Sequence, residues 1–122
     1  MRGYGYSLPV VSRLGVGAAA AARDVLSAAG VSADQVDLVE FNEAFASQTL
    51  ACLDQVGIDA ERANLDGGAL ALGHAYGASG AVLVTRLLAQ ARRAGTPGSL
   101  ALAMISSAGG MGTAALLEYQ RL

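Results

Sequence analysis

The sequence predicts a single α/β domain over residues 1–122, in which strands and helices alternate in the order βαβαβαββ. Three observations support this fold class. Short apolar runs of strand length alternate with longer segments that carry the 3.6-residue period of a helix. Glycines and prolines lie between these segments and form no linker. The length of 122 residues, without an internal repeat, accommodates one domain.

The first strand and the first helix are expected near the N-terminus. Residues 1–11 alternate loosely and predict a strand, which Pro9 either ends or confines to an edge of the sheet. Residues 17–29 are rich in alanine, the residue with the highest helix propensity, and therefore predict a helix. Gly30 is placed to end that helix.

The central part of the chain is expected to add two strands and a helix. Residues 36–41 are mostly apolar and predict a short buried strand. Asn42 follows as the expected N-cap of a helix over residues 43–56, whose apolar stripe is wide. Residues 63–65 predict a further short strand.

The C-terminal part is expected to contain a buried helix and a hairpin. Residues 78–94 predict a helix with no charged residue before Arg86, and a helix that is apolar on all sides is buried on all sides. We therefore expect this helix to lie between two layers. Residues 100–105 and 113–117 predict two strands joined by a tight glycine turn.

Composition excludes several classes of function. Hydrophobic residues make up 53% of the chain and charged residues only 15%, so surplus apolar surface is expected to need a partner. The net charge of −2 argues against nucleic-acid binding. No apolar run reaches the roughly 20 residues that span a bilayer, so we expect a cytoplasmic protein. Cys52 is the only cysteine, which excludes an internal disulfide and a cysteine-cluster metal site, and no metal is expected.

Three polar residues follow predicted strands or precede a helix: Asn42, His74 and Ser106. Ligands of α/β folds gather at the carboxyl ends of strands, so these side chains are expected to converge on one pocket. His74 is the only histidine and lies just before a helix N-terminus, where a general acid/base or an oxyanion donor fits. The alternatives are a histidine that only satisfies loop carbonyls and an asparagine that only caps a helix.

Glycine-rich runs offer two further interpretations. Residues 107–112 could hold an oxyanion with backbone N–H groups, or form a plain hairpin turn. No lysine follows this run, which excludes a Walker loop. Residues 15–17 form a degenerate dinucleotide fingerprint, a weak alternative because Pro9 disturbs the strand that it requires. Cys52 lies on an apolar helix face and is expected to be a buried structural thiol.

Four ordered blocks resemble the C-terminal half of the thiolase family. They are NEAFA at residues 42–46, NLDGGALALGH at 64–74, GASG at 77–80 and GGMG at 109–112. The resemblance covers nearly the whole chain and also accounts for the glycines at residues 15–17. It implies one half of the five-layered thiolase fold, with a five-stranded mixed sheet and helices on both faces. The helix near residue 80 would belong to the central layer shared with the N-terminal half.

The resemblance also implies roles for individual residues. Thiolases exchange acyl groups with coenzyme A through a cysteine of the N-terminal half, which this chain lacks. His74 would activate that cysteine on a partner chain and polarise the thioester oxygen, and Asn42 would hold a water in the same oxyanion hole. The implied substrate-binding residues are Ala44, Phe45 and Gly109, and the backbone N–H of Ala108 would belong to a second oxyanion hole.

Two positions depart from the family pattern. Ser106 stands where the family has its second cysteine, the acid/base for the proton at the α-carbon. A hydroxyl is a far weaker acid than a thiol, whose pKa is about 8.5, so thiolysis or Claisen condensation is not expected. Ala75 and Tyr76 stand where the family usually has a proline after its histidine, which relaxes the constraint on that loop.

The sequence therefore predicts a subunit or fragment of a thiolase-like acyltransferase in lipid or polyketide metabolism. Its expected substrate is an acyl-CoA or another acyl thioester, without a bound cofactor. Its expected partner is an N-terminal-half chain, in a higher oligomer of the heterodimer. One alternative is a non-catalytic scaffold that stabilises a partner thiolase or ketosynthase-like enzyme. Another is a self-contained hydrolase in which Ser106 acts with His74.

Overall fold

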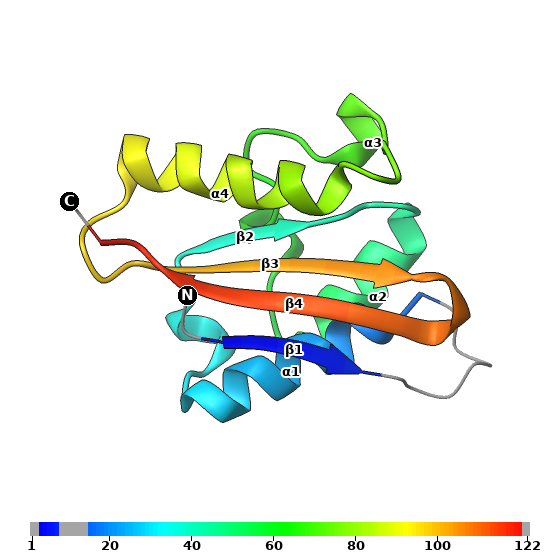
Figure 1. Ribbon diagram of the computed structural model, residues 1–122, viewed down its shortest axis with the longest axis horizontal. Helices are drawn as coiled ribbons and strands as arrows, with labels where there is room; N and C mark the ends of the chain where they lie inside the picture. The colour runs from blue at the N-terminus through cyan, green and yellow to red at the C-terminus, as the bar shows by residue number, and fades with distance from the viewer. Residues whose placement is uncertain (1–2, 8–14, 121–122) are drawn as a thin grey trace.

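The computed structural model describes residues 3–7 and 15–120, which form a sheet with helices on both faces (Figure 1). The strands are β1 (Gly3–Ser7), β2 (Leu38–Phe41), β3 (Leu100–Ser107) and β4 (Met111–Glu118). The helices are α1 (Gly17–Ala29), α2 (Ala46–Val56), α3 (Ala69–Leu72) and α4 (Ser79–Ala94). Short 3₁₀ turns are η1 (Ala33–Gln35), η2 (Ala60–Arg62) and η3 (Ala108–Gly110).

The sheet is mixed, with the strand order β1-β4-β3-β2. The two long strands β3 and β4 form an antiparallel hairpin, and β1 adds to it antiparallel to β4. β2 pairs parallel to β3, with Phe41 opposite Met104. β2 and β3 therefore end at the same edge of the sheet, where ligands of such folds gather.

The fifth strand predicted over residues 63–65 does not form. Within the described residues the sheet has four strands, and Ala63 makes only one parallel bridge, to Val39. The turn η2 ends immediately before Ala63, and Asn64 after it has a φ of 52°, in the left-handed region. The extended backbone is thus interrupted on both sides of a single residue, which is too short for a strand.

The first strand and helix agree with the predictions. β1 is an edge strand, whereas Pro9 lies outside the described residues. The helix α1 spans the predicted residues and ends at Gly30, whose φ of 66° is in the region that glycine adopts without strain. The backbone N–H of Gly30 donates to the carbonyl of Ser27 at 3.1 Å and closes the last turn.

The prediction that Asn42 caps a helix from Glu43 is wrong. The helix α2 begins at Ala46, and residues 42–45 form a loop between β2 and α2. The backbone N–H of Asn42 donates to the carbonyl of Met104 at 2.9 Å, so Asn42 continues the pairing with β3 beyond the end of β2. Its buried side-chain amide is therefore available for a contact other than a helix cap.

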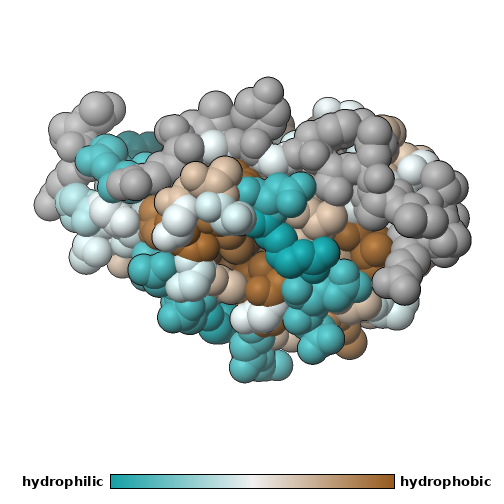
Figure 2. Space-filling model, turned by 90° about the horizontal axis from the view of Figure 1, so that it is seen from below, coloured by the Kyte–Doolittle hydropathy of each residue, from teal (hydrophilic) through white to brown (hydrophobic). Residues whose placement is uncertain are grey.

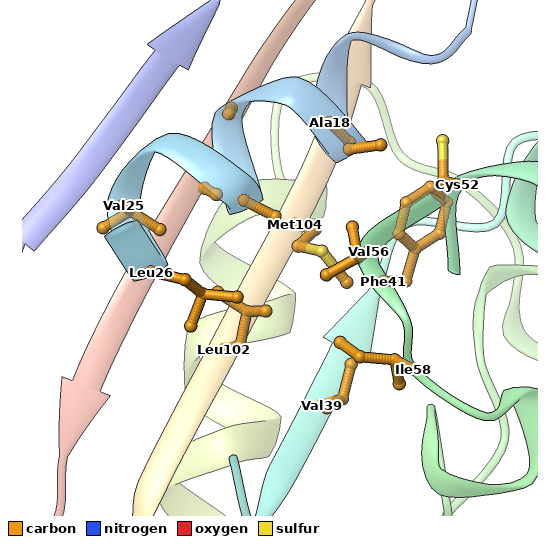
Figure 3. Packing of buried hydrophobic residues seen from close by; sticks show 14 of the residues in the cluster. Ala18, Val25, Leu26, Val39, Phe41, Cys52, Val56, Ile58, Leu102 and Met104 are labelled. Atoms are coloured by element: carbon orange, nitrogen blue, oxygen red, sulfur yellow. The ribbon is translucent and has the colours of Figure 1, made fainter. Parts of the chain in front are cut away.

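Alternate residues of β3 face two different hydrophobic clusters. Leu102 and Met104 point into the cluster under α1 and α2, which Figure 3 shows with Phe41 and Cys52 beside one another. Ala101 and Ala103 point to the other face and pack against α4. The small alanine side chains allow α4 to lie close to the sheet.

The helix α4 lies where the sequence predicts it, but only one of its faces is buried. Leu83 and Leu87 pack on the sheet, whereas the outward-facing Val82 and Leu88 are 44% and 53% exposed. The predicted second layer over this helix is not supplied by the described part of the chain. The opposite side of the molecule, seen from below in Figure 2, carries hydrophilic residues distributed among hydrophobic ones. None of the described helices has the length and apolar character needed to cross a membrane.

Candidate active site

A cavity of about 540 Å³ lies at the edge of the sheet where β3 ends. Its walls come from the segment before α1, the β2–α2 loop with the start of α2, the α3–α4 loop, and the end of β3 with its turn. The lining residues are Gly15, Ala44, Phe45, Gln48, His74, Tyr76, Ile105, Ser106, Ser107 and Ala108. The fold thus brings together residues from distant parts of the sequence, from Gly15 to Ala108.

His74 is held by the first residue of α4. Its Nδ1 atom lies 2.6 Å from the Oγ atom of Ser79. The Ser79 hydroxyl donates its only proton to the carbonyl of Ala75, at 3.0 Å, so its oxygen accepts a hydrogen bond from His74 Nδ1–H. This bonding pattern assigns the proton of the neutral imidazole to Nδ1 and leaves the lone pair on Nε2.

Asn42 lies against the other nitrogen of the same ring. The Asn42 Nδ2 atom is 3.4 Å from His74 Nε2, a long hydrogen bond in which the amide N–H donates. His74 is therefore positioned from two sides, by α4 and by the end of β2. An incoming thiol can give its proton to Nε2, and the resulting Nε2–H can then donate to a developing oxyanion.

Glu43 ties the loop that contains Asn42 to the loop that precedes α3. Its Oε1 atom accepts from Asn64 Nδ2 at 2.6 Å, and its Oε2 atom accepts from the backbone N–H of Leu70 at 3.0 Å. The Asn64 amide also bridges the N–H and the carbonyl of Phe41, at 2.8 and 3.0 Å. A Cβ atom at Gly68 would overlap the Glu43 carboxylate, so a side chain there would displace Glu43 from these hydrogen bonds.

The Ser106 hydroxyl is bonded to the backbone both as a donor and as an acceptor. It donates to the carbonyl of Gly15 at 2.6 Å and accepts from the N–H of Ala18 at 3.1 Å. The same Gly15 carbonyl also accepts from Gln48 Nε2 at 2.9 Å and from the Cys52 thiol at 3.3 Å. Ser106 makes no hydrogen bond to His74 in the described structure, so the geometry gives no support to a Ser106–His74 hydrolase pair.

Cys52 is buried and does not line the cavity, in agreement with the structural role predicted for it. Burial raises the pKa of its thiol above the ordinary value, against smaller lowering effects from hydrogen bonds with Ala19 and Ser106 and from the charge of Arg23. A buried thiol with a raised pKa is a poor nucleophile near neutrality.

The prediction that Asn42, His74 and Ser106 converge on one pocket holds only in part, because Asn42 contacts His74 but does not line the cavity. Ala44, Phe45 and Ala108 line the cavity, with Phe45 70% exposed. Gly109 lies in the turn η3, with a φ of 80°, but is not a lining residue. Tyr76 lines the cavity beside His74, their ring centroids 4.8 Å apart. The described residues contain no group of three or more His, Cys, Asp or Glu side chains that could hold a metal ion.

Two contacts of the site were not predicted from the sequence. Ser79 lies within the predicted helix over residues 78–94, and nothing in that prediction indicates its bond to His74. Glu43 was placed inside a helix, whereas it lies in a loop and holds Asn64. The only signal for either contact was that each polar residue belongs to one of the four motif blocks.

Comparisons with known proteins identify relatives of this chain. The family model described as "Thiolase, C-terminal domain" matches residues 2–119. The peroxisomal 3-ketoacyl-CoA thiolase 1 of Arabidopsis thaliana is 44% identical over 105 residues, which are 86% of this chain and 24% of that protein. An acetyl-CoA acetyltransferase of Pseudomonas aeruginosa is 49% identical over 105 residues, covering 85% of this chain and 26% of that protein.

Solved structures agree with these relatives. A crystal structure of human mitochondrial 3-ketoacyl-CoA thiolase in complex with CoA superposes with a TM-score of 0.90 and 37% identity, covering 98% of this chain and 30% of that chain. The Bacillus anthracis acetyl-CoA acetyltransferase superposes with a TM-score of 0.89 and 33% identity, covering 96% and 29% of the two chains. The chain thus spans about a quarter of the length of the curated relatives that it matches. Since the family model covers almost all of the sequence, the chain belongs to the thiolase family and corresponds to its C-terminal domain.

Proposed function

We propose that this chain is one component of a thiolase-like acyltransferase and that it provides His74 and oxyanion-hole groups to a cysteine of another polypeptide. The observation that carries the proposal is the state of His74, whose Nε2 lone pair accepts only a long hydrogen bond from Asn42 while Nδ1 is bound to Ser79. No cysteine lies among the described residues that line the cavity. A base without its own nucleophile is the arrangement that a second chain would complete.

The reaction begins with a proton transfer in this scheme. The partner's thiol gives its proton to His74 Nε2, and the thiolate attacks the carbonyl carbon of an acyl thioester. The carbonyl electrons move to the oxygen, which accepts hydrogen bonds from His74 Nε2–H and from a water held by Asn42. The C–S bond to the leaving thiol then breaks, and that thiol takes the proton from His74. The product is an acyl-cysteine on the partner.

The proposed chemistry stops at acyl transfer. A carbon–carbon step would need a base for the α-proton at residue 106, but the Ser106 hydroxyl donates its proton to the carbonyl of Gly15. An alcohol has a far higher pKa than a thiol. The hydrogen bond to the Gly15 carbonyl makes the Ser106 proton still harder to remove. The substrate is therefore an acyl-CoA or another acyl thioester, with acylation of the partner's cysteine as the reaction.

The partner is proposed to cover the outer side of α3 and α4. Leu70 and Leu72 of α3 and Val82 and Leu88 of α4 are 44–63% exposed, an unusual density of large apolar side chains at a surface. The lining residues of the cavity include no arginine, and the sequence has no lysine. The coenzyme A phosphates are therefore proposed to bind the partner chain, in a higher oligomer of the heterodimer.

Co-expression with the N-terminal half of a related thiolase tests this function. The two chains should purify as a complex whose N-terminal-half cysteine gains the mass of the acyl group after incubation with an acyl-CoA. His74→Ala should lower the acylation rate by at least about a hundredfold, since general acid–base groups contribute 10²–10⁴-fold. Ser47→Ala, a change at an exposed position of α2, is the matched control. A stable complex that never acquires an acyl group contradicts the proposal.

The second candidate is a scaffold that binds and stabilises a partner enzyme without taking part in its chemistry. It is favoured by the engagement of Ser106 with Gly15 and Ala18, which removes one acid/base of the family's site. In that case His74→Ala would leave both the activity and the assembly of the complex unchanged. The acylation rates of the two variants therefore distinguish the candidates.

A further inference from the structure

Two strongly exposed aromatic side chains line the cavity of the candidate active site. The sequence contains only four tyrosines, two phenylalanines and no tryptophan. Phe45 and Tyr76 nevertheless line the same cavity, and they are 70% and 92% exposed in this chain. Aromatic rings contribute most to binding when they become buried, so an exposed pair in a cavity points to a ligand surface.

Tyr76 lies directly beside the reacting group. Its ring centroid is 4.8 Å from that of His74, and the two ring planes are tilted by 36°. The residue belongs to the short loop between Gly73 and α4, so the loop that positions the imidazole also positions the phenol ring. An acyl group whose carbonyl reaches His74 Nε2 therefore has the Tyr76 ring as its neighbour.

The rest of the cavity is lined by both polar and apolar groups. The Ser106 hydroxyl and the Gln48 Nε2 atom are already bonded to the Gly15 carbonyl, whereas the Gln48 Oε1 atom is buried without a hydrogen-bond partner among the described residues. Phe45, Tyr76 and Ile105 supply the apolar surface. This surface suits a hydrocarbon chain better than a polar or charged substituent.

We propose that Tyr76 is a specificity-determining residue that, together with Phe45, binds the hydrocarbon chain of the acyl group and favours acyl chains of several methylenes over acetyl. This inference rests on the proposed acyl transfer. An acetyl group ends at one methyl beyond the carbonyl and gains little from a ring beside His74. A longer chain extends over the ring and buries it, so loss of the ring affects the longer chain more.

The test compares acylation by octanoyl-CoA and acetyl-CoA in the two-chain complex. Tyr76→Ala should lower the octanoyl-to-acetyl ratio of acylation rate constants about tenfold, the lower end of what small differences in a hydrophobic pocket produce. Tyr76→Phe should keep the preference, because the ring and not the hydroxyl makes the contact. Tyr119→Ala, the same chemical change outside the cavity, is the control and should leave the ratio unchanged.

The outcomes separate this inference from the proposed function. An unchanged ratio for Tyr76→Ala, in a complex whose wild type acylates, overturns the inference and leaves the function intact. Dissociation of the Tyr76→Ala complex also overturns it, because the ring would then belong to the interface between the chains.

A binding measurement decides the inference if the wild-type complex does not acylate at all. The full chain alone is mixed with millimolar octanoyl-pantetheine, and transferred nuclear Overhauser effects are recorded between tyrosine ring protons and the octanoyl methylenes. Effects that are lost in Tyr76→Ala but reappear at the phenylalanine ring protons in Tyr76→Phe support the inference. Their absence in the wild-type chain overturns it.

Discussion

The Nδ1 atom of His74 lies 2.6 Å from the Oγ atom of Ser79, the first residue of α4. This contact joins a catalytic candidate in a loop to a buried position of the longest helix. Because the Ser79 proton is directed to Ala75, the contact also selects the imidazole tautomer that leaves Nε2 able to accept a proton. Ser79 is thus a positioning residue for His74.

Ser79→Ala should lower the acylation rate in the two-chain complex by about ten- to a hundredfold. Without the acceptor oxygen, His74 Nδ1–H loses its partner and the ring is free to adopt the other tautomer. Because His74 is the only histidine, its ¹⁵N resonances report the tautomer directly. An unchanged rate together with an unchanged tautomer would show that Ser79 only begins the helix.

Ser106→Cys should restore proton exchange at the α-carbon of a bound acyl thioester. A thiol has a pKa of about 8.5 and can lose its proton near neutrality, whereas the serine hydroxyl cannot. Deuterium incorporation from D₂O, measured by mass spectrometry in the two-chain complex, checks this. Ser106→Ala serves as the control and should give no exchange, and an equally inactive Ser106→Cys would mean that the site differs from the family pattern in more than one group.

Arg86→Leu should reduce the free energy of unfolding by about 3–5 kcal/mol, because it leaves a buried carboxylate without its cation. The Glu40 side chain is only 1% exposed and accepts from Arg86 Nε at 2.8 Å and from Gln90 Nε2 at 2.7 Å. The matched control is Arg93→Leu, whose pair with Asp66 has side chains 63% and 42% exposed. That variant should lose no more than about 1 kcal/mol in urea denaturation. Equal losses would contradict the burial argument.

The Cys52 thiol should make stability fall as the pH rises above about 8.5, the ordinary pKa of a thiol. Burial raises the pKa of this thiol in the folded state, so between the two pKa values the folded chain binds more protons than the unfolded chain. Its contribution is complete below the unfolded pKa and is lost as the pH rises through the folded one. The free energy of unfolding, measured by urea denaturation, should fall less between pH 7 and pH 10 for Cys52→Ala than for the wild type. An equal fall in the two proteins would exclude a buried thiol.

Elements set by local sequence were predicted well. The helix α1 ends at Gly30 as expected, because alanine propensity and a glycine stop both act within a few residues. The prediction of a strand at residues 63–65 was wrong because Asn64 adopts a left-handed backbone conformation. Its side-chain amide bonds both backbone groups of Phe41, 23 residues away, and the local sequence does not show this contact. The cap at Asn42 failed because its backbone pairs with Met104 instead.

For the site as well, the residue types could be predicted from the sequence, whereas the contacts between distant residues could not. The sequence was sufficient to list His74, Asn42 and Ser106 as candidates, because their residue types and their places after strands were visible in it. The partner of the Ser106 hydroxyl is Gly15, 91 residues earlier, and only the fold brings these groups together. The structure therefore changes the interpretation of Ser106 from a weak base to a hydroxyl that is bonded to the backbone.

The reactivity of the partner's cysteine tests the central claim most directly. In the complex with the wild-type chain, iodoacetamide at pH 7 should alkylate that cysteine at least about tenfold faster than in the complex with His74→Ala, because His74 Nε2 takes the thiol proton. Both complexes must first be shown to assemble to the same extent. Equal alkylation rates in two fully assembled complexes would contradict the claim that this chain supplies the base.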